Sequence, residues 1–261
     1  MSTSKLARLF AELVGTFTLT AVVIAVSKNY GNPLFTTISA AATFAVLVSM
    51  FGPVSGGHFN PALTLGMFSI RKIKLVETIL YVAMQAVGAI LAWKLFEFLS
   101  PDRLIESVVN EFDWKVFTAE MIGMVIFAMG FVAVIFRKFM GGHVGATVGL
   151  ALFAGSVAVA VVVVNRQLVT GILNPAIAIG LGYRPDSQSY LAYFFGPVIG
   201  AVVGMNLYKM FFASDKMDVA MVPAGSSFKP LAPVVASKSV SKAPAKKAVT
   251  KKKTAKKTTK R

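Results

Sequence analysis

Long apolar stretches alternate with short polar connections along the first 212 residues of the chain. Six stretches carry few charged residues and lie near residues 9–28, 34–55, 75–98, 115–136, 144–164 and 187–209. Each is about 20 residues long, which is the length needed to cross a hydrocarbon core of about 30 Å. Lipid offers backbone groups no hydrogen-bond partner, and the sequence lacks the period-2 pattern of barrel strands. We therefore predict six transmembrane helices.

Composition separates a membrane body from a basic tail. The chain has 261 residues, of which 56% are hydrophobic and 15% charged, whereas soluble domains carry about 25% charged residues. Its net charge is +16, and residues 213–261 hold thirteen basic and two acidic residues. We expect a channel domain over residues 1–212 and a disordered, Lys-rich tail over residues 213–261. With no cysteine and two histidines, we expect no cofactor and no metal.

Two sequence patterns occur twice in the same order. Ala11-Glu12-Leu13-Val14-Gly15 is matched by Ala119-Glu120-Met121-Ile122-Gly123, and Asn60-Pro61-Ala62 by Asn174-Pro175-Ala176. The halves, residues 1–107 and 108–212, each contain three spans. Because three is odd, the second half enters the membrane from the opposite side, so we predict an inverted repeat.

Each Asn-Pro-Ala motif predicts the start of a short helix. Asn is a favoured N-cap and Pro a favoured first helical residue. The apolar residues that follow, Leu63–Ile70 and Ile177–Tyr183, suffice for about 15 Å of helix, half of the hydrocarbon thickness. We predict that each motif starts a short helix, with Gly56 and Gly57 permitting close turns before the first.

These features together resemble the aquaporin (major intrinsic protein) family. The likeness covers about residues 5–212 and is carried by Ser55-Gly56-Gly57-His58-Phe59-Asn60-Pro61-Ala62, Gln85-Ala86-Val87-Gly88-Ala89, Thr170-Gly171 and Gly196-Pro197. The resemblance implies six transmembrane helices plus two re-entrant half-helices. It also implies a homotetrameric passive channel for water and small neutral solutes such as glycerol, urea or ammonia, and not an enzyme.

In such a channel both half-helix N-termini point at the midplane, where their dipoles repel cations. The amides of Asn60 and Asn174 then donate hydrogen bonds to the permeant. Non-helical backbone is tolerated at membrane depth where it lines a wet cavity. We expect the pore-facing carbonyls to be those of Gly56, Gly57, His58, Ile172 and Leu173.

Glu12 and Glu120 are the carboxylates that lie well inside predicted spans. One interpretation is that they relay protons, as in a proton-coupled transporter. The other, which their repeat-related positions favour, is that each accepts hydrogen bonds from a re-entrant loop and supports it. His58 is interpreted as a loop-packing residue, and no residue set suggests catalysis.

The selectivity filter departs from the family pattern. The family places Arg directly after the second motif, where this chain has Ile177, and the loop before it is one residue short. Counting as the family does, the other filter positions are Ala40, Val162 or Val163, and Gly171. This apolar filter is expected to be wide enough for small neutral solutes.

Other markers point away from glycerol. Ala178 stands where glycerol channels carry Asp, and Tyr193-Phe194 resembles the aromatic pair of water channels. Arg166 and Arg184 are alternative sources of the missing charge near the outer mouth.

Loop charges scarcely decide the topology, whereas the basic tail favours both termini in the cytoplasm. The tail has three interpretations: contact with anionic lipid, binding of nucleic acid as part of a membrane anchor, or a solvated segment without a partner. Lipid contact is the simpler of the two binding interpretations, because the tail directly follows a membrane span.

Overall fold

A computed structural model describes residues 4–100, 111–139, 142–162 and 171–212. The chain divides into two units, residues 1–217 and 218–261, and every described residue belongs to the first unit. The predicted disordered tail therefore lies outside the described residues.

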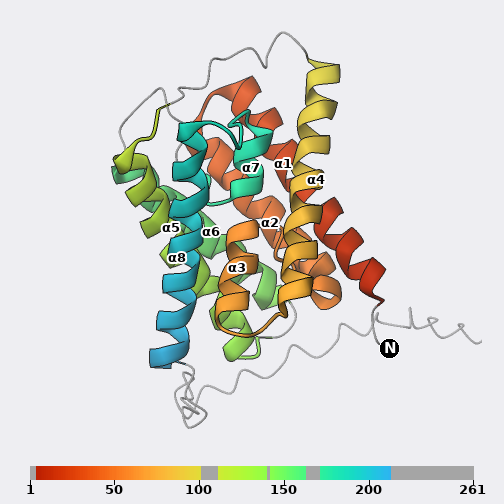
Figure 1. The fold of residues 1–261 in the computed structure, drawn as a ribbon, viewed down its shortest axis with the longest axis vertical. Coiled ribbons are helices and arrows are strands. Elements are labelled where there is room, and N and C mark those ends of the chain that lie inside the picture. Colours follow the sequence, from red (N-terminus) through yellow and green to blue (C-terminus); the bar gives the residue numbers. More distant parts are fainter. Residues whose placement is uncertain (1–3, 101–110, 140–141, 163–170, 213–261) are drawn as a thin grey trace, which may run out of the picture. The chain divides into compact units, whose positions relative to one another are not determined.

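The described residues form helices and loops, with no strand among them. The helices are α1 Lys5–Tyr30, α2 Pro33–Ser55, α3 Pro61–Ser69, α4 Leu75–Leu99, α5 Trp114–Phe136, α6 Gly142–Val162, α7 Pro175–Gly180 and α8 Gln188–Phe212 (Figure 1). Five of them are long and apolar enough to cross a membrane, and the described part of α6 adds a shorter apolar helix, His143–Val159. The all-α fold with six long helices and two half-helices is confirmed.

Capping residues explain where several helices begin. The Ser4 side chain accepts from the Ala7 N–H at 3.1 Å, and the Asn32 side chain accepts from the Phe35 N–H at 3.1 Å. Asp113 does the same for Lys115 at the start of α5. Each cap satisfies a backbone donor that has no partner within its helix, and together they set the boundaries between the long helices.

The two halves pack in the same way. In the first half α1 packs against α2 and α4, in the second α5 packs against α6 and α8, and the α2–α6 contact joins the halves. Glycines bring the backbones close: a Cβ at Gly88 would lie 2.5 Å from the Leu13 carbonyl oxygen, and one at Gly204 would lie 2.7 Å from the Val125 carbonyl oxygen. Small residues at helix contacts are what close packing in lipid requires.

The outer surface of the bundle is apolar, and the few charged or amide side chains deep inside the spans are buried. Large apolar side chains on α4 are exposed, among them Val76 at 69% and Ile79 at 58%, whereas Glu12, Gln85 and Glu120 are fully buried. This distribution is what a bilayer selects, because lipid solvates apolar side chains and leaves polar groups to find partners inside.

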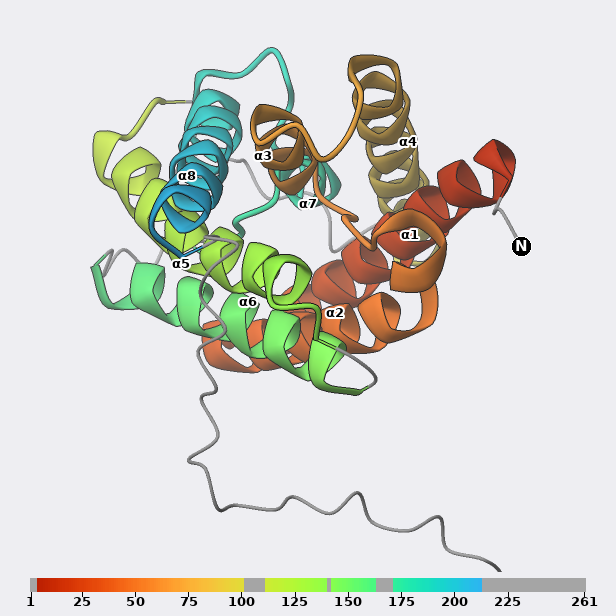
Figure 2. The same ribbon diagram turned by 90° about the horizontal axis from the view of Figure 1, so that it is seen from below.

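The short helices α3 and α7 lie one beyond the other inside the bundle. Figure 1 places α7 in the upper half and α3 in the lower half, and Figure 2, seen from below, places α3 in front of α7. Helix α7 ends at Gly180, three residues earlier than the predicted end at Tyr183. The N–H groups of Gly182 and Tyr183 bond back to the Ile179 and Ala178 carbonyls, and Gly182 has φ +98°, which turns the chain out of the helix.

Candidate functional site

The two Asn-Pro-Ala motifs meet at the N-terminal ends of α3 and α7. The Asn60 Nδ2 donates to the Leu173 carbonyl at 2.8 Å, and the Asn174 Nδ2 donates to the Phe59 carbonyl at 3.0 Å. Each amide oxygen caps its own half-helix, since Asn60 accepts from Ala62 at 2.8 Å and Asn174 from the corresponding alanine at 3.0 Å. We call the two hydrogen bonds from the Asn60 and Asn174 amides to the opposite loops the reciprocal Asn clasp.

Strained backbone aims the two acceptor carbonyls of the clasp. Phe59 has φ +45° and Leu173 has φ +51°, and both side chains are fully buried. A left-handed conformation costs a residue with a Cβ about 1–2 kcal/mol. The residue before each Asn takes this conformation in both halves, and its carbonyl then faces the Asn of the opposite half.

Glu120 receives three backbone donors from the loop before α7. Its Oε1 accepts from the N–H groups of Gly171 at 2.7 Å and Ile172 at 3.0 Å, and its Oε2 accepts from the N–H of Leu173 at 2.7 Å. Hydrogen bonds to a charged acceptor are roughly twice as strong as neutral ones. The Glu120 carboxylate of α5 thus accepts a hydrogen bond from each of the three residues before Asn174.

Glu12 holds the loop before α3 with a different set of donors. Its two oxygens accept from the backbone N–H groups of His58 at 3.0 Å and Phe59 at 2.7 Å. Two side chains complete the set: the Ser55 hydroxyl at 2.6 Å and the Gln85 amide at 2.8 Å. Glu12 and Glu120 therefore occupy equivalent places in the two halves. Among the described residues, Glu12 accepts from two backbone and two side-chain donors, whereas Glu120 accepts from three backbone donors.

His58 is packed inside the protein. Its Nδ1 lies 3.2 Å from the Thr64 hydroxyl, and its ring makes edge contacts with Tyr81 and Phe131 at centroid distances of 5.5 and 5.8 Å. The side chain fills the space between the first loop, α4 and α5. Among the described residues, no group of three His, Cys, Asp or Glu side chains could hold a metal ion.

Several loop carbonyls next to the clasp have no internal partner. No described residue donates a hydrogen bond to the carbonyl oxygens of Gly56, Gly57, His58 or Ile172, and each of these residues except Gly56 is buried as a whole. A buried carbonyl without a partner is costly, so such groups are normally satisfied by protein or water. The fifth predicted carbonyl, that of Leu173, accepts the hydrogen bond from the Asn60 amide.

The predicted filter positions are only partly described. Ala40 is half-buried on α2, Gly171 has φ +79° and its carbonyl accepts from the Ser156 hydroxyl at 2.8 Å, and Ile177 is 4% exposed on α7. The side chain of Val162, and the whole of Val163, lie outside the described residues. The filter assignment stays a prediction.

Neither arginine suggested as a substitute for the filter charge is placed in the pore. Arg184 is exposed and pairs with Asp186 at 3.2 Å, which leaves it directed at solvent. Arg166 lies outside the described residues.

Phe59 is the site residue that sequence reasoning overlooked. Its carbonyl is half of the clasp, yet Phe carries no signal for a positive φ. The equivalence of Phe59 and Leu173 in the repeat was the one available clue.

Comparison with known proteins finds relatives over most of the chain. Residues 1–208 match the family described as Major intrinsic protein. The chain is 30% identical to Nodulin-26 of Glycine max, covering 81% of this chain and 80% of that protein. It is 28% identical to Aquaporin Z of Photorhabdus laumondii, covering 81% of this chain and 100% of that protein.

A solved structure shares the fold. The aquaglyceroporin from Plasmodium falciparum superposes with a TM-score of 0.65 at 19% identity, covering 80% of this chain and 97% of that chain. The family match spans both motifs and every described helix as far as Tyr208 in α8, and it confirms the resemblance drawn from the sequence. The chain belongs to the major intrinsic protein family.

Proposed function

We propose that this protein is a passive channel of the aquaporin type that conducts water and small neutral solutes. The observation that carries the proposal is the pairing of donors and acceptors around the clasp. Each Asn amide has two hydrogens, and the clasp uses one of them. The second hydrogen, together with the open carbonyls of His58 and Ile172, offers a neutral polar molecule both a donor and acceptors.

Charge selectivity follows from the two half-helices. Helices α3 and α7 direct their N-termini at one place, and each terminus carries about half a positive charge. Cations meet repulsion there, whereas a neutral molecule with one acceptor atom is turned toward the amides of Asn60 and Asn174. Protons that move along hydrogen-bonded water meet the same barrier.

The apolar filter sets the range of solutes. Ala40, Val162 or Val163, Gly171 and Ile177 supply little polarity and no fixed charge at the outer constriction. Ile177 occupies the place of the family arginine, and Arg184 is exposed and paired elsewhere. A filter of this kind accepts solutes larger than water, such as glycerol or urea, and leaves cation exclusion to the midplane.

Glu12 and Glu120 are proposed to support the two loops. Four donors surround the first carboxylate and three the second, all within 3.0 Å. A group that relays protons must exchange its partners during transport, and releasing these donors would free the loop that carries the motif. This arrangement favours a passive channel over a proton-coupled transporter.

The assembly follows the family. We infer a homotetramer with one pore per subunit, embedded in lipid as a multi-pass protein with both termini in the cytoplasm. The basic tail supports the orientation. Contact of the tail with anionic lipid is the preferred interpretation of its charge, ahead of nucleic acid.

The test is osmotic shrinkage of proteoliposomes followed by light scattering. Vesicles that contain the wild-type protein are challenged with sucrose, glycerol and urea. We expect water permeability well above that of empty vesicles, followed by reswelling as glycerol or urea enters. Water permeability equal to that of empty vesicles would overturn the channel proposal.

Ile177→Arg tests the filter assignment, with Ile177→Leu as the matched apolar control. Arg at this position is expected to lower glycerol and urea flux strongly while water flux persists, and the Leu variant should resemble wild type. If Ile177→Arg leaves solute flux unchanged in correctly folded protein, Ile177 does not line the constriction.

A further inference from the structure

A basic pocket lies where α3 ends and α4 begins. Its volume is about 630 Å³, and its lining includes Phe68, Arg71, Lys72, Ile73, Lys74 and Glu77. Pockets that hold small molecules are about 300–1,000 Å³. The channel does not use this pocket, which lies at the opposite end of α3 from the clasp.

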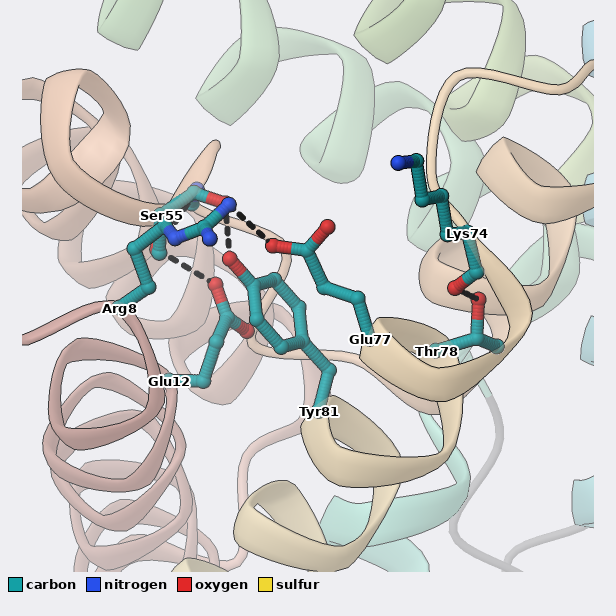
Figure 3. Close-up of polar contacts among 8 residues, drawn as sticks. Arg8, Glu12, Ser55, Lys74, Glu77, Thr78 and Tyr81 are labelled. Carbon is teal, nitrogen blue, oxygen red and sulfur yellow. Dashed lines mark hydrogen bonds and ion pairs between the residues drawn. The ribbon is translucent and has the colours of Figure 1, made fainter. Parts of the chain in front are cut away.

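The charge of the pocket is positive and largely uncompensated. Its one carboxylate among these residues, Glu77, is already bonded by the Arg8 guanidinium. Figure 3 shows the Arg8 guanidinium bonded to the Glu77 carboxylate, and no dashed line joins the Lys74 ammonium to that carboxylate. The Lys72 ammonium lies 4.7 Å from the centre of the Phe136 ring. Among the described residues, neither Arg71 nor Lys74 has a side-chain partner.

Neighbouring helices hold the pocket in shape. The Asn206 amide of α8 donates to the Ser69 hydroxyl at 2.8 Å, and the Lys209 ammonium donates to the Ile70 carbonyl at 3.4 Å. On the α4 side the Thr78 hydroxyl donates to the Lys74 carbonyl at 2.9 Å (Figure 3). The basic side chains therefore project from a backbone that is fixed on both sides.

The pocket lies at the depth of lipid headgroups. Helix α3 starts at the midplane motif and has nine residues, so its far end lies about 13 Å away, close to the edge of a hydrocarbon core about 30 Å thick. Exposed apolar side chains accompany it: Phe68 in its lining is 39% exposed, and Leu75 and Val76, which directly follow Lys74 in the chain, are 56% and 69% exposed. Cations beside exposed apolar surface suit a ligand with a charged head and a hydrocarbon body.

We propose that this pocket binds the phosphate group of an anionic membrane lipid. The Arg71 guanidinium and the Lys74 ammonium donate charge-assisted hydrogen bonds to the phosphate oxygens, and the acyl chains lie along the exposed face of α4. A lipid is favoured over a soluble phosphate compound because the pocket opens beside apolar surface at the edge of the hydrocarbon. The pocket is distinct from the tail, and its lipid binding does not rest on channel activity.

Native mass spectrometry of the full-length protein tests the proposal. Purified protein is titrated with dioleoyl phosphatidic acid or dioleoyl phosphatidylcholine. The double variant Arg71→Gln/Lys74→Gln is compared with Lys5→Gln/Lys138→Gln, which removes two charges from the same membrane face outside the pocket. Lys5 begins α1, whose Arg8 reaches Glu77. All proteins keep the tail, so its charge is constant.

Wild type is expected to bind phosphatidic acid about tenfold more tightly than phosphatidylcholine, since one lost charged hydrogen bond is worth about that factor. The pocket variant should lose this preference, and the control variant should keep it. Equal losses in both variants would show diffuse attraction and overturn the proposal. Displacement of the lipid by millimolar inorganic phosphate would assign the pocket to a soluble ligand instead. A Tm equal to that of wild type confirms that the pocket variant is folded.

Discussion

The two loop-supporting carboxylates should respond differently to the same substitution. Glu120 meets three backbone N–H groups, those of Gly171, Ile172 and Leu173. In Glu120→Gln one oxygen becomes an NH₂ group, and the better placement keeps two of the three donors on the remaining oxygen. The Leu173 N–H then loses its 2.7 Å bond and faces the new NH₂ group, which itself finds no acceptor among these partners.

The cost can be worked out from these contacts. Each buried donor left without a partner costs about 1–3 kcal/mol, and each of the two remaining bonds loses about 1 kcal/mol when its acceptor becomes neutral. Glu120→Gln should therefore destabilise the protein by about 4–8 kcal/mol.

Glu12→Gln should be milder because two of its partners are side chains. An NH₂ group in place of Oε1 can donate to the Ser55 hydroxyl, and one in place of Oε2 can donate to a flipped Gln85 amide. The Gln85 Oε1 has no partner at present. One backbone N–H, of His58 or Phe59, is lost in either case and the two bonds to the remaining oxygen weaken, so the expected cost by the same reasoning is about 3–5 kcal/mol.

The assay is thermal unfolding of both variants in the same detergent, followed by intrinsic fluorescence. For a protein of this size 1 kcal/mol corresponds to about 2–4 °C in Tm. We expect Tm for Glu120→Gln to lie at least about 2 °C below that for Glu12→Gln. An equal Tm for the two variants, or a lower one for Glu12→Gln, would refute the reasoning from donor types.

Two further substitutions test packing and backbone strain. A Cβ at Gly200 would overlap the Met121 carbonyl oxygen and lie 2.8 Å from the Met124 Cβ. Gly200→Leu should therefore separate α5 from α8, and no folded protein should elute from size-exclusion chromatography. The control Ile199→Leu, at an exposed position that faces lipid, should elute as wild type does. Lys138 is exposed and has φ +52°, a conformation that glycine adopts without strain. Lys138→Gly should therefore raise the free energy of unfolding by about 0.5–1 kcal/mol. A Tm for Lys138→Gly no higher than that for Lys138→Ala would contradict this.

Membrane spans and motif positions were predictable because their signals are local. A run of about 20 apolar residues means a crossing wherever it occurs, and Asn followed by Pro begins a helix by its own chemistry. The donors on Glu12 and Glu120 could also be anticipated, since a buried carboxylate must find hydrogen-bond partners. Each of these inferences needs only the residue and the solvent around it.

Features that depend on contacts across the two halves were not predictable. The clasp joins Asn60 to Leu173, and nothing within either motif indicates which carbonyl the opposite amide reaches. The left-handed φ of Phe59 belongs to a residue type that rarely adopts it. The early end of α7 depends on Gly182, whose role is set by the hydrogen bonds that close the helix.

The basic pocket could not be recognised from the number of charged residues in the loops. In the sequence, Arg71, Lys72 and Lys74 are simply three of the loop charges, which together scarcely decide the topology. Their significance comes from the turn between α3 and α4, which gathers them around one space while Arg8 occupies the neighbouring carboxylate.

The reciprocal Asn clasp also determines when during synthesis the pore can form. The Asn60 amide and the Leu173 carbonyl are 113 residues apart in the chain. At synthesis rates of about 5–20 residues per second, the first motif waits roughly 6–20 s for its partner to be made. During that interval the first half has its loop carboxylate but no opposing carbonyl. The midplane of the channel can therefore form only after the second half has entered the membrane, so a ribosome that stalls before Leu173 leaves helices in the bilayer without an ordered pore.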